Sequence, residues 1–179
     1  RVALFFGLAL SIAAIPVFLF GTNGTTTLLA LLANISYVLA YTPLKQKSHA
    51  ALFVGAVPGA IPPLMGWTAK TAQVDPGAMA LFTLMFFWQI PHFLAIATFR
   101  RDDYQRAGLK VLPVERGDRV TRHHIVAYLA ALVLVTLLLV PVGVGGSLYL
   151  AAALLLGAGF FAFGAWGLRA SAGVRWARG

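Results

Sequence analysis

Six long apolar runs divide this sequence, and they limit its possible folds more than any other feature. The runs cover residues 2–20, 25–42, 50–69, 76–99, 125–144 and 147–168. Each is close to the ~20 residues that a helix needs to cross the hydrocarbon core of a bilayer. None shows the period-two alternation of a strand, and a helix satisfies its backbone polar groups within one segment. The sequence therefore predicts an all-α fold, a polytopic transmembrane helical bundle with six spans.

Composition also indicates a membrane protein. The 179 residues are 60% hydrophobic and 11% charged, with a mean hydropathy of +0.84, whereas soluble domains are roughly half apolar and about a quarter charged. A net charge of +9 would suggest nucleic acid in a soluble protein, but here the basic residues lie in short gaps between apolar runs. That placement suits anionic lipid headgroups, so we expect a lipid bilayer and no nucleic acid as partner.

The basic residues predict the orientation of the spans. All of them except Lys70 fall at the chain ends or in the gaps after the second and fourth runs. The positive-inside rule places this side, with the loop 100–124, in the cytoplasm or the matrix of an organelle. On the opposite side, residues 21–24 and 145–146 are short and rich in glycine, which predicts tight turns between antiparallel helices.

The chain is predicted to form one membrane domain over residues 1–179, and we expect it to be part of a longer protein. It begins at Arg1 without a methionine, an apolar run follows at once, and no signal peptide can be read. The basic stretch 171–179 has no natural stop. The composition, rich in Ala, Gly and Arg, favours a bacterial inner (plasma) membrane over the mitochondrial inner membrane.

The third run is unusual in its glycines and prolines, which are Gly55, Pro58, Gly59, Pro62, Pro63 and Gly66. Prolines kink a helix and free carbonyls, and glycines allow close approach of other groups. One interpretation is tight helix packing by small residues. The other is the wall of a substrate cavity, which the two adjacent prolines in mid-span favour.

His92 is an ionisable residue inside the fourth run, eight residues before Arg100. At ~1.5 Å per residue it lies ~12 Å inside the helix end, where an ionisable group usually has a function. We expect it to be buried, as a ligand or hydrogen-bond partner of a polar substrate or as a proton relay. The alternative is a neutral histidine bonded to a carbonyl that a nearby proline has freed. Trp88 and Phe93 flank it; aromatic faces attract cations, but such residues also fill spans.

Asp102 and Asp103 are the only adjacent acids among five in the chain. No cysteine is present, so a metal site must use Asp, Glu or His. Mg²⁺ takes one or two carboxylates with water and phosphate oxygens, and Arg100, Arg101 and Lys45 would meet the remaining phosphate charge. A Mg²⁺–phosphate site is therefore one interpretation. A solvated acid pair that bridges neighbouring arginines is the other.

Tyr41 and Lys45 lie four residues apart at the end of the second run. On a continuous helix they share a face, although Pro43 would disturb the last turn if it broke the helix. By themselves they are best interpreted as an interface tyrosine beside a lysine that reaches toward the headgroups.

Taken together, four segments resemble the UbiA superfamily of intramembrane prenyltransferases, and within it the branch that farnesylates haem. The matching segments are YTPLK at 41–45, VGAVPGAIPPLMGWTA at 54–69, WQIPHF at 88–93 and RRDDYQRAGLKVLPVERG at 100–117. The last two are the most specific, because the DYxxAGxxxLP pattern after a helix with PHF is similar to the haem branch and not to the quinone branches.

The resemblance implies a nine-span helical fold and the transfer of a farnesyl group from farnesyl diphosphate to a vinyl group of haem b, which yields haem O. In this family two aspartate-bearing loops hold Mg²⁺ and diphosphate on the cytoplasmic or matrix side. It implies Asp103, and less directly Asp102, as Mg²⁺ ligands, with Tyr41 and Lys45 at the diphosphate. The implied substrate-binding residues are Arg100 and Arg101 for the diphosphate, and His92 with Trp88 on the haem side.

The family's first aspartate-rich motif is missing here, because no acid precedes Asp75. We therefore expect the six runs to correspond to the third to eighth spans of the family. Haem A synthase or another protein of the haem pathway is a candidate partner. Two alternatives remain open: a prenyltransferase with a quinone-precursor acceptor, and a non-catalytic transporter or assembly subunit.

Residues 1–179 alone are predicted to be inactive, because they carry only one of the two aspartate-bearing loops. The check is a farnesyl transfer assay on residues 1–179 with farnesyl diphosphate, haem b and Mg²⁺. Measurable formation of farnesylated haem would contradict this prediction.

Overall fold

The computed structural model describes residues 2–169 and 175–178, and it confirms the all-helical prediction. Arg1, one of the basic residues predicted on the cytoplasmic side, lies outside the described residues, as does most of the basic stretch 171–179. The elements are α1 (Val2–Gly21), α2 (Gly24–Ile35), the π-helical segment η1 (Ser36–Tyr41), α3 (Thr42–Leu44), α4 (Ala51–Thr71), α5 (Pro76–Phe99), α6 (Arg101–Arg106), α7 (Leu112–Glu115), α8 (Gly117–Leu138), α9 (Ser147–Trp166) and the 3-10 turn η3 (Arg175–Arg178).

Several of these helices have the length and hydropathy of membrane spans. Five segments of the described chain qualify: Gly24–Leu44, which joins α2, η1 and α3, together with α4, α5, α8 and α9. α1 adds a shorter apolar helix over Phe5–Gly21. Large apolar side chains on α1 and α9 are mostly exposed, as expected for helices that face lipid. The protein is an integral membrane protein.

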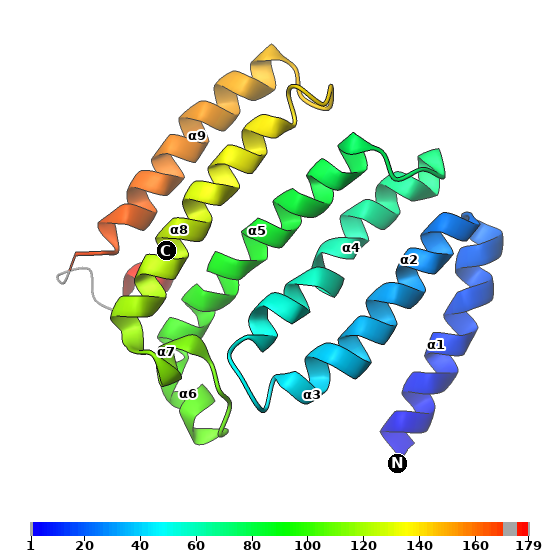
Figure 1. Cartoon of the computed structure of the whole chain (residues 1–179), viewed down its shortest axis with the longest axis horizontal. Coiled ribbons are helices and arrows are strands. Elements are labelled where there is room, and N and C mark those ends of the chain that lie inside the picture. The colour runs from blue at the N-terminus through cyan, green and yellow to red at the C-terminus, as the bar shows by residue number, and fades with distance from the viewer. Residues whose placement is uncertain (1, 170–174, 179) are drawn as a thin grey trace.

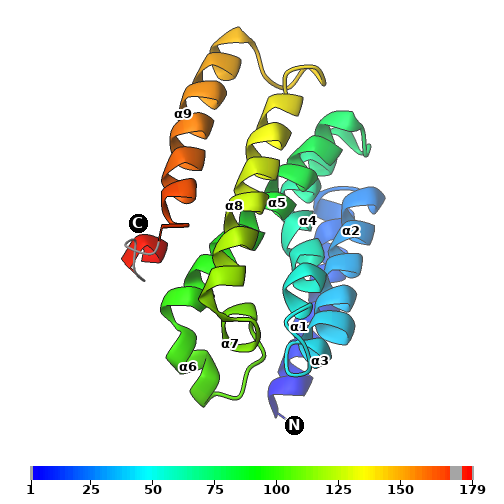
Figure 2. The same cartoon turned by 60° about the vertical axis from the view of Figure 1, so that its left-hand side comes forward.

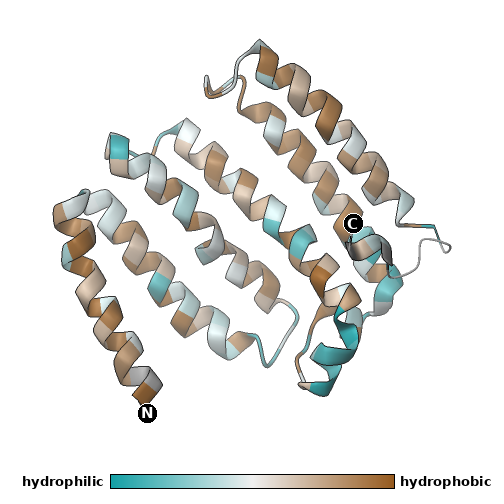
Figure 3. Ribbon diagram, turned by 180° about the vertical axis from the view of Figure 1, so that it is seen from behind, coloured by the Kyte–Doolittle hydropathy of each residue, from teal (hydrophilic) through white to brown (hydrophobic). Residues whose placement is uncertain are grey.

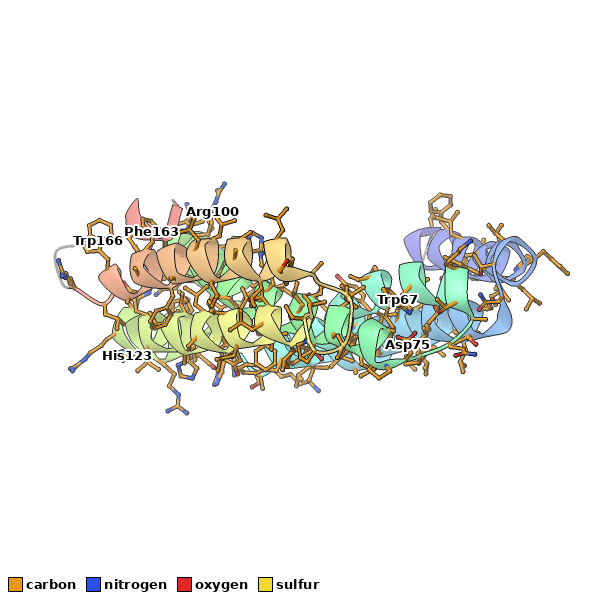
Figure 4. All side chains as sticks on the ribbon, turned by 90° about the horizontal axis from the view of Figure 1, so that it is seen from above. Trp67, Asp75, Arg100, His123, Phe163 and Trp166 are labelled. Carbon is orange, nitrogen blue, oxygen red and sulfur yellow. The ribbon has the colours of Figure 1, made fainter. Side chains whose placement is uncertain are left out.

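The helices form a single curved row. Contacts join α1 to α2, α2 to α4, α4 to α5, α5 to α8 and α8 to α9, and the same order can be followed across Figure 1 and after rotation in Figure 2. Seen from above in Figure 4, α1 and α9 are both displaced to the same side of the row. The bundle is therefore an arc, with α5 near its middle.

The two ends of the row differ in polarity. The connections α1–α2, α4–α5 and α8–α9 lie at one end, and α3, α6 and α7 lie at the other (Figure 1). Hydrophilic residues gather around α6 in Figure 3. Residues 100–118, which include α6 and α7, hold five of the basic residues and four of the five acids. At the opposite end Asp75 caps α5 and accepts a hydrogen bond from the indole Nε1 of Trp67 at 3.0 Å (Figure 4).

The core surrounds α5. Its buried members include Ile90 and Leu94 of α5, Ala56 of α4, and Ile125 and Leu129 of α8. Ala56 and Ile90 have no exposed surface, and small residues at such positions allow two helix backbones to approach closely. α5 is thus held by α4 on one side and by α8 on the other.

Both ends of one helix differ from the sequence prediction. The fifth span was predicted over residues 125–144, whereas α8 begins at Gly117 and ends at Leu138. Asp118 in the first turn favours a helix start, since acids stabilise the positive end of a helix, so the helix continues beyond the apolar run. At the other end Pro141 disfavours helix in the residue before it. The predicted loop 100–124 therefore contains α6, α7 and the first two turns of α8.

Asn23 fixes how α2 meets α4 at the end opposite α6. Its side-chain oxygen caps α2 by accepting from the Thr26 backbone N–H at 3.0 Å, and its amide donates to the Thr68 carbonyl of α4 at 2.7 Å. The hydroxyls of Thr26 and Thr68, both buried, are 2.9 Å apart. Lipid provides no hydrophobic driving force for helix association, so hydrogen-bonded polar pairs of this kind set the register of two packed helices.

Asn23→Ala is predicted to destabilise the protein by about 1–2 kcal/mol, because it removes a helix cap and an interhelical hydrogen bond. Thermal unfolding in detergent measures the effect. Asn23→Ser is the matched control. It keeps a capping oxygen and lacks only the amide donor, so it should lose less stability than Asn23→Ala. Equal stability of all three proteins would contradict the assigned role.

Candidate functional site

A cavity of about 350 Å³ opens at the α6 end of the bundle, among η1, α3, α4, α5 and the segment that links α6 to α7. We call it the Tyr41 cavity. Most of its wall is apolar, with Leu52, Phe93 and Leu94 among the lining residues. Its main polar side chains are Tyr37, Tyr41, Lys45, His49, Gln89, Tyr104 and Lys110. The structure therefore places polar groups and cations around a largely apolar hollow.

Tyr41 and Lys45 enter this cavity together, as the four-residue spacing predicts. Pro43 does not break the helix between them, since the Lys45 backbone N–H still bonds to the Tyr41 carbonyl at 2.9 Å. The wider turn of η1 comes just before Pro43, whose ring would clash with a carbonyl in an ordinary α-helix. The Lys45 ammonium lies 5.7 Å from the centre of the Tyr41 ring, within range of a cation–π interaction.

Glycines in α4 make room for two of the cavity side chains. A Cβ atom on Gly55 would lie 2.6 Å from Cδ2 of Tyr41, and one on Gly59 would lie 2.1 Å from Oε1 of Gln89. Both glycines line the cavity, which agrees with the interpretation of this helix as a cavity wall. Pro62 and Gly66, by contrast, are exposed, and a Cβ on Gly66 would meet no atom within 4 Å.

Gln89 is a cavity residue that the sequence analysis missed. It is 5% exposed, and its amide Nε2 donates to the Ala56 carbonyl of α4 at 3.0 Å. The available signal was a carboxamide inside an apolar run, because polar groups within spans face the bundle interior and bond to other helices.

A histidine–glutamate pair links His49, which lines the cavity, to α7. His49 Nδ1, just before α4, pairs with Glu115 Oε2 of α7, 66 residues away in the chain. This hydrogen bond, followed by the charges of His49 and Lys110, holds the pKa of Glu115 below its ordinary value. Sequence reasoning missed the pair, since nothing in either segment indicates the other.

Asp103 lies at the α6 end of the bundle between two arginines. Arg100 Nη1 donates to Asp103 Oδ2 at 3.2 Å, and Arg106 pairs with the other carboxylate oxygen. These bonds, led by that from Arg100, keep the pKa of Asp103 below its ordinary value. Asp103 and both arginines are exposed. The next residue, Tyr104, lines the Tyr41 cavity, so α6 connects the acid to the cavity mouth.

Arg101 and Asp102 lie elsewhere on α6. Arg101 faces α8, where its Nη1 is 3.4 Å from Asp118, and its Nε is buried without a hydrogen-bond partner. Asp102 is exposed, and its backbone carbonyl accepts from Arg106. Neither residue lines the Tyr41 cavity, so their predicted roles in substrate and metal binding rest on the sequence alone.

His92 and Trp88 line a different cavity, of about 460 Å³, bounded by α5, α8, α9 and η3. We call it the His92 cavity. The two rings stack with centroids 4.8 Å apart, and Phe93 lies 5.6 Å from His92. The expectation of a buried imidazole is wrong, because His92 is exposed at this cavity. Residues 88 and 92 share one face of α5, whereas 89 and 93 share another that faces the Tyr41 cavity.

The comparisons with known proteins place the chain among prenyltransferases. The chain is 62% identical over 178 residues to the protoheme IX farnesyltransferase of Sorangium cellulosum, covering 99% of this chain and 64% of that protein. Proteins of the same name from Myxococcus xanthus and Protochlamydia amoebophila are 52% and 39% identical, with 99% and 98% of this chain and 60% and 62% of those proteins covered. The chain thus spans about three-fifths of the length of these relatives. No solved structure matches it.

The sequence model of the UbiA prenyltransferase family matches residues 1–179, which agrees with the resemblance in the four motif segments. Because this match extends over the whole chain, the chain belongs to the UbiA prenyltransferase family.

Proposed function

We propose that the protein containing this chain transfers a farnesyl group from farnesyl diphosphate to a vinyl group of haem b and adds water to the second vinyl carbon, which forms the hydroxyethylfarnesyl group of haem O and releases diphosphate and a proton. The observation that carries the proposal is the Tyr41 cavity, an apolar hollow with Tyr41 and Lys45 at its mouth and the Asp103 helix beside it. The relatives named above, all called protoheme IX farnesyltransferase, support the choice of both substrates.

The cationic end of the cavity suits a diphosphate. Lys45 and Lys110 line the mouth, and Arg100 stands at the end of α5, where its side chain is exposed. Breaking the bond between the prenyl carbon and its oxygen places new negative charge on the departing diphosphate. Fixed cations aimed at that charge stabilise the transition state more than the bound substrate, which lowers the barrier.

The acids at this end fit Mg²⁺ as part of a larger ligand set. The described residues contain no group of three or more potential metal-ligating side chains. Mg²⁺ needs only one or two carboxylates when water and phosphate oxygens complete its coordination, and Asp103 with Asp102 would supply these. When bound, the ion would neutralise diphosphate charge. Arg100 and Arg106 hold the Asp103 carboxylate ionised, the form that a cation requires.

The apolar wall of the Tyr41 cavity suits the prenyl chain. Leu52, Phe93 and Leu94 would cover the chain and keep water from an allylic carbocation. The Tyr41 ring beside Lys45 offers an aromatic face of the kind that attracts cations.

We propose that haem b lies against the other face of α5 and extends one vinyl group past α5 to the diphosphate end of the Tyr41 cavity, because transfer requires the two reacting carbons to be about 3–3.5 Å apart. The His92 cavity is the larger of the two, and its walls are mainly apolar and aromatic, with Trp88 and Phe163 among them. His92 and Trp88 are the residues proposed to contact the acceptor.

We propose that the protein lies in a bacterial inner membrane, with residues 100–124 in the cytoplasm. The bacterial origin of the relatives and the basic residues at the α6 end support this location. Haem A synthase or another haem-pathway protein stays the predicted protein partner.

Asp103→Asn is predicted to lower kcat/KM for farnesyl transfer by about a hundredfold or more, because the amide neither carries the charge for Mg²⁺ nor holds Arg100. The assay is haem O formation by the full-length protein. Asp75→Asn is the matched control at the opposite end of α5, where asparagine also caps a helix. Unchanged transfer in Asp103→Asn would contradict the role of Asp103, and absence of transfer in the wild type would favour a non-catalytic membrane protein.

The His49–Glu115 pair is predicted to hold the segment 107–116 over the cavity mouth in a pH-dependent way. Because the pKa of Glu115 is lowered in the folded protein, its contribution is present above the ordinary glutamate pKa of about 4.3 and is lost as the pH falls through the lowered value. Hydrogen exchange of residues 107–116, corrected for intrinsic rates, should therefore accelerate in acid. Glu115→Gln should show the faster exchange already at neutral pH.

Asp118→Asn is the control for this measurement, since it removes another acid of the same region that pairs with Arg101 instead. Its exchange over residues 107–116 should match the wild type. Slow exchange in Glu115→Gln at neutral pH would show that the pair does not hold the segment.

A further inference from the structure

The Tyr41 cavity has a defined inner end. Three helical segments each line it over an interval of eight residues, from Lys45 back to Tyr37, from Ala51 to Gly59, and from Ala97 back to Gln89. At about 1.5 Å per residue, each interval corresponds to a depth of about 12 Å. Lys45 and Ala51 lie at the mouth, so Gly59 and Gln89 are the lining residues of α4 and α5 farthest from it.

Gln89 is held at this inner end by two features. Its Nε2 donates to the Ala56 carbonyl at 3.0 Å, and the side chain is 5% exposed. Its Oε1 occupies the space beside Gly59, where a Cβ atom would lie only 2.1 Å away. Any side chain at position 59 would therefore displace the carboxamide, and the flexible end of Gln89 would have to move toward the hollow.

We propose that Gly59 and Gln89 together determine the length of prenyl chain that the cavity accepts; the proposal rests on the proposed prenyl transfer. With the diphosphate at Lys45, the prenyl chain extends toward α4 and α5, and its last isoprene unit meets the carboxamide of Gln89. A longer chain would have to push Gln89 off the Ala56 carbonyl, and a shorter one would leave apolar wall uncovered.

The test compares kcat/KM for geranyl, farnesyl and geranylgeranyl diphosphate in the full-length protein, with haem b as acceptor. Gly59→Ala should move the preference from farnesyl toward geranyl by about tenfold or more, because carbons that do not fit a pocket cost at least this factor. Gln89→Ala should open the inner end and move the preference toward geranylgeranyl by a similar factor. Gly66→Ala lies on the same helix in open space, so its ratios should equal those of the wild type.

Two further variants separate size from polarity and from misfolding. In Gly59→Ala/Gln89→Ala the new methyl group no longer meets a carboxamide, so the geranyl preference of Gly59→Ala should disappear. Gln89→Leu keeps a side chain of similar size and should keep the farnesyl preference. If Gln89 instead binds the acceptor, Gln89→Leu and Gln89→Ala will lower all three rates by one factor, and the proposal is wrong.

The outcomes also separate this proposal from the proposed function. A wild-type protein that transfers farnesyl while every variant keeps the wild-type ratios would overturn the role of Gly59 and Gln89 and leave prenyl transfer intact. A wild-type protein that transfers none of the three prenyl groups would overturn both.

Discussion

The close packing of α4 against α5 is the interaction on which the rest of the structure depends. Lipid does not drive helices together as water does, so spans associate through van der Waals contact and hydrogen bonds between them. Ala56 and Ala60 of α4 and Ile90 of α5 have no exposed surface, and Gln89 bonds across the same interface. The small residues bring the backbones close, and the carboxamide fixes their register.

This packing leaves α5 with two different faces. One face turns Gln89 and Phe93 toward the Tyr41 cavity, and the other turns Trp88 and His92 toward α8 and α9. A helix places residues one position apart on faces about 100° apart, since 3.6 residues make a turn. The four consecutive residues from Trp88 to Pro91 therefore line two cavities and contribute to the core, although they form a single motif in the sequence.

The sequence was sufficient where the information is local. Apolar length predicted the helices, and the spacing of Tyr41 and Lys45 predicted their shared face. It was insufficient where two distant segments meet. His49 and Glu115 are 66 residues apart, and the space that Gly59 leaves for Gln89 is a property of two helices and not of either one. The predicted boundaries of α8 were wrong for another reason. Capping residues and prolines determine where a helix starts and ends, whereas the thickness of the bilayer determines the length of an apolar run.

The arrangement at α6 has a consequence for how an anionic substrate would enter under the proposed function. Asp103 is paired with Arg100 and Arg106, so acid and cations are already in contact before a substrate arrives. All three side chains are exposed, and exposed ion pairs contribute little to stability. A diphosphate with Mg²⁺ could then exchange partners at small cost, since the cation would take the carboxylate and the arginines would turn to phosphate oxygens. The pairing keeps the Asp103 carboxylate ionised and holds the three side chains together at the α6 end, and the weakness of the pairing is what allows the exchange.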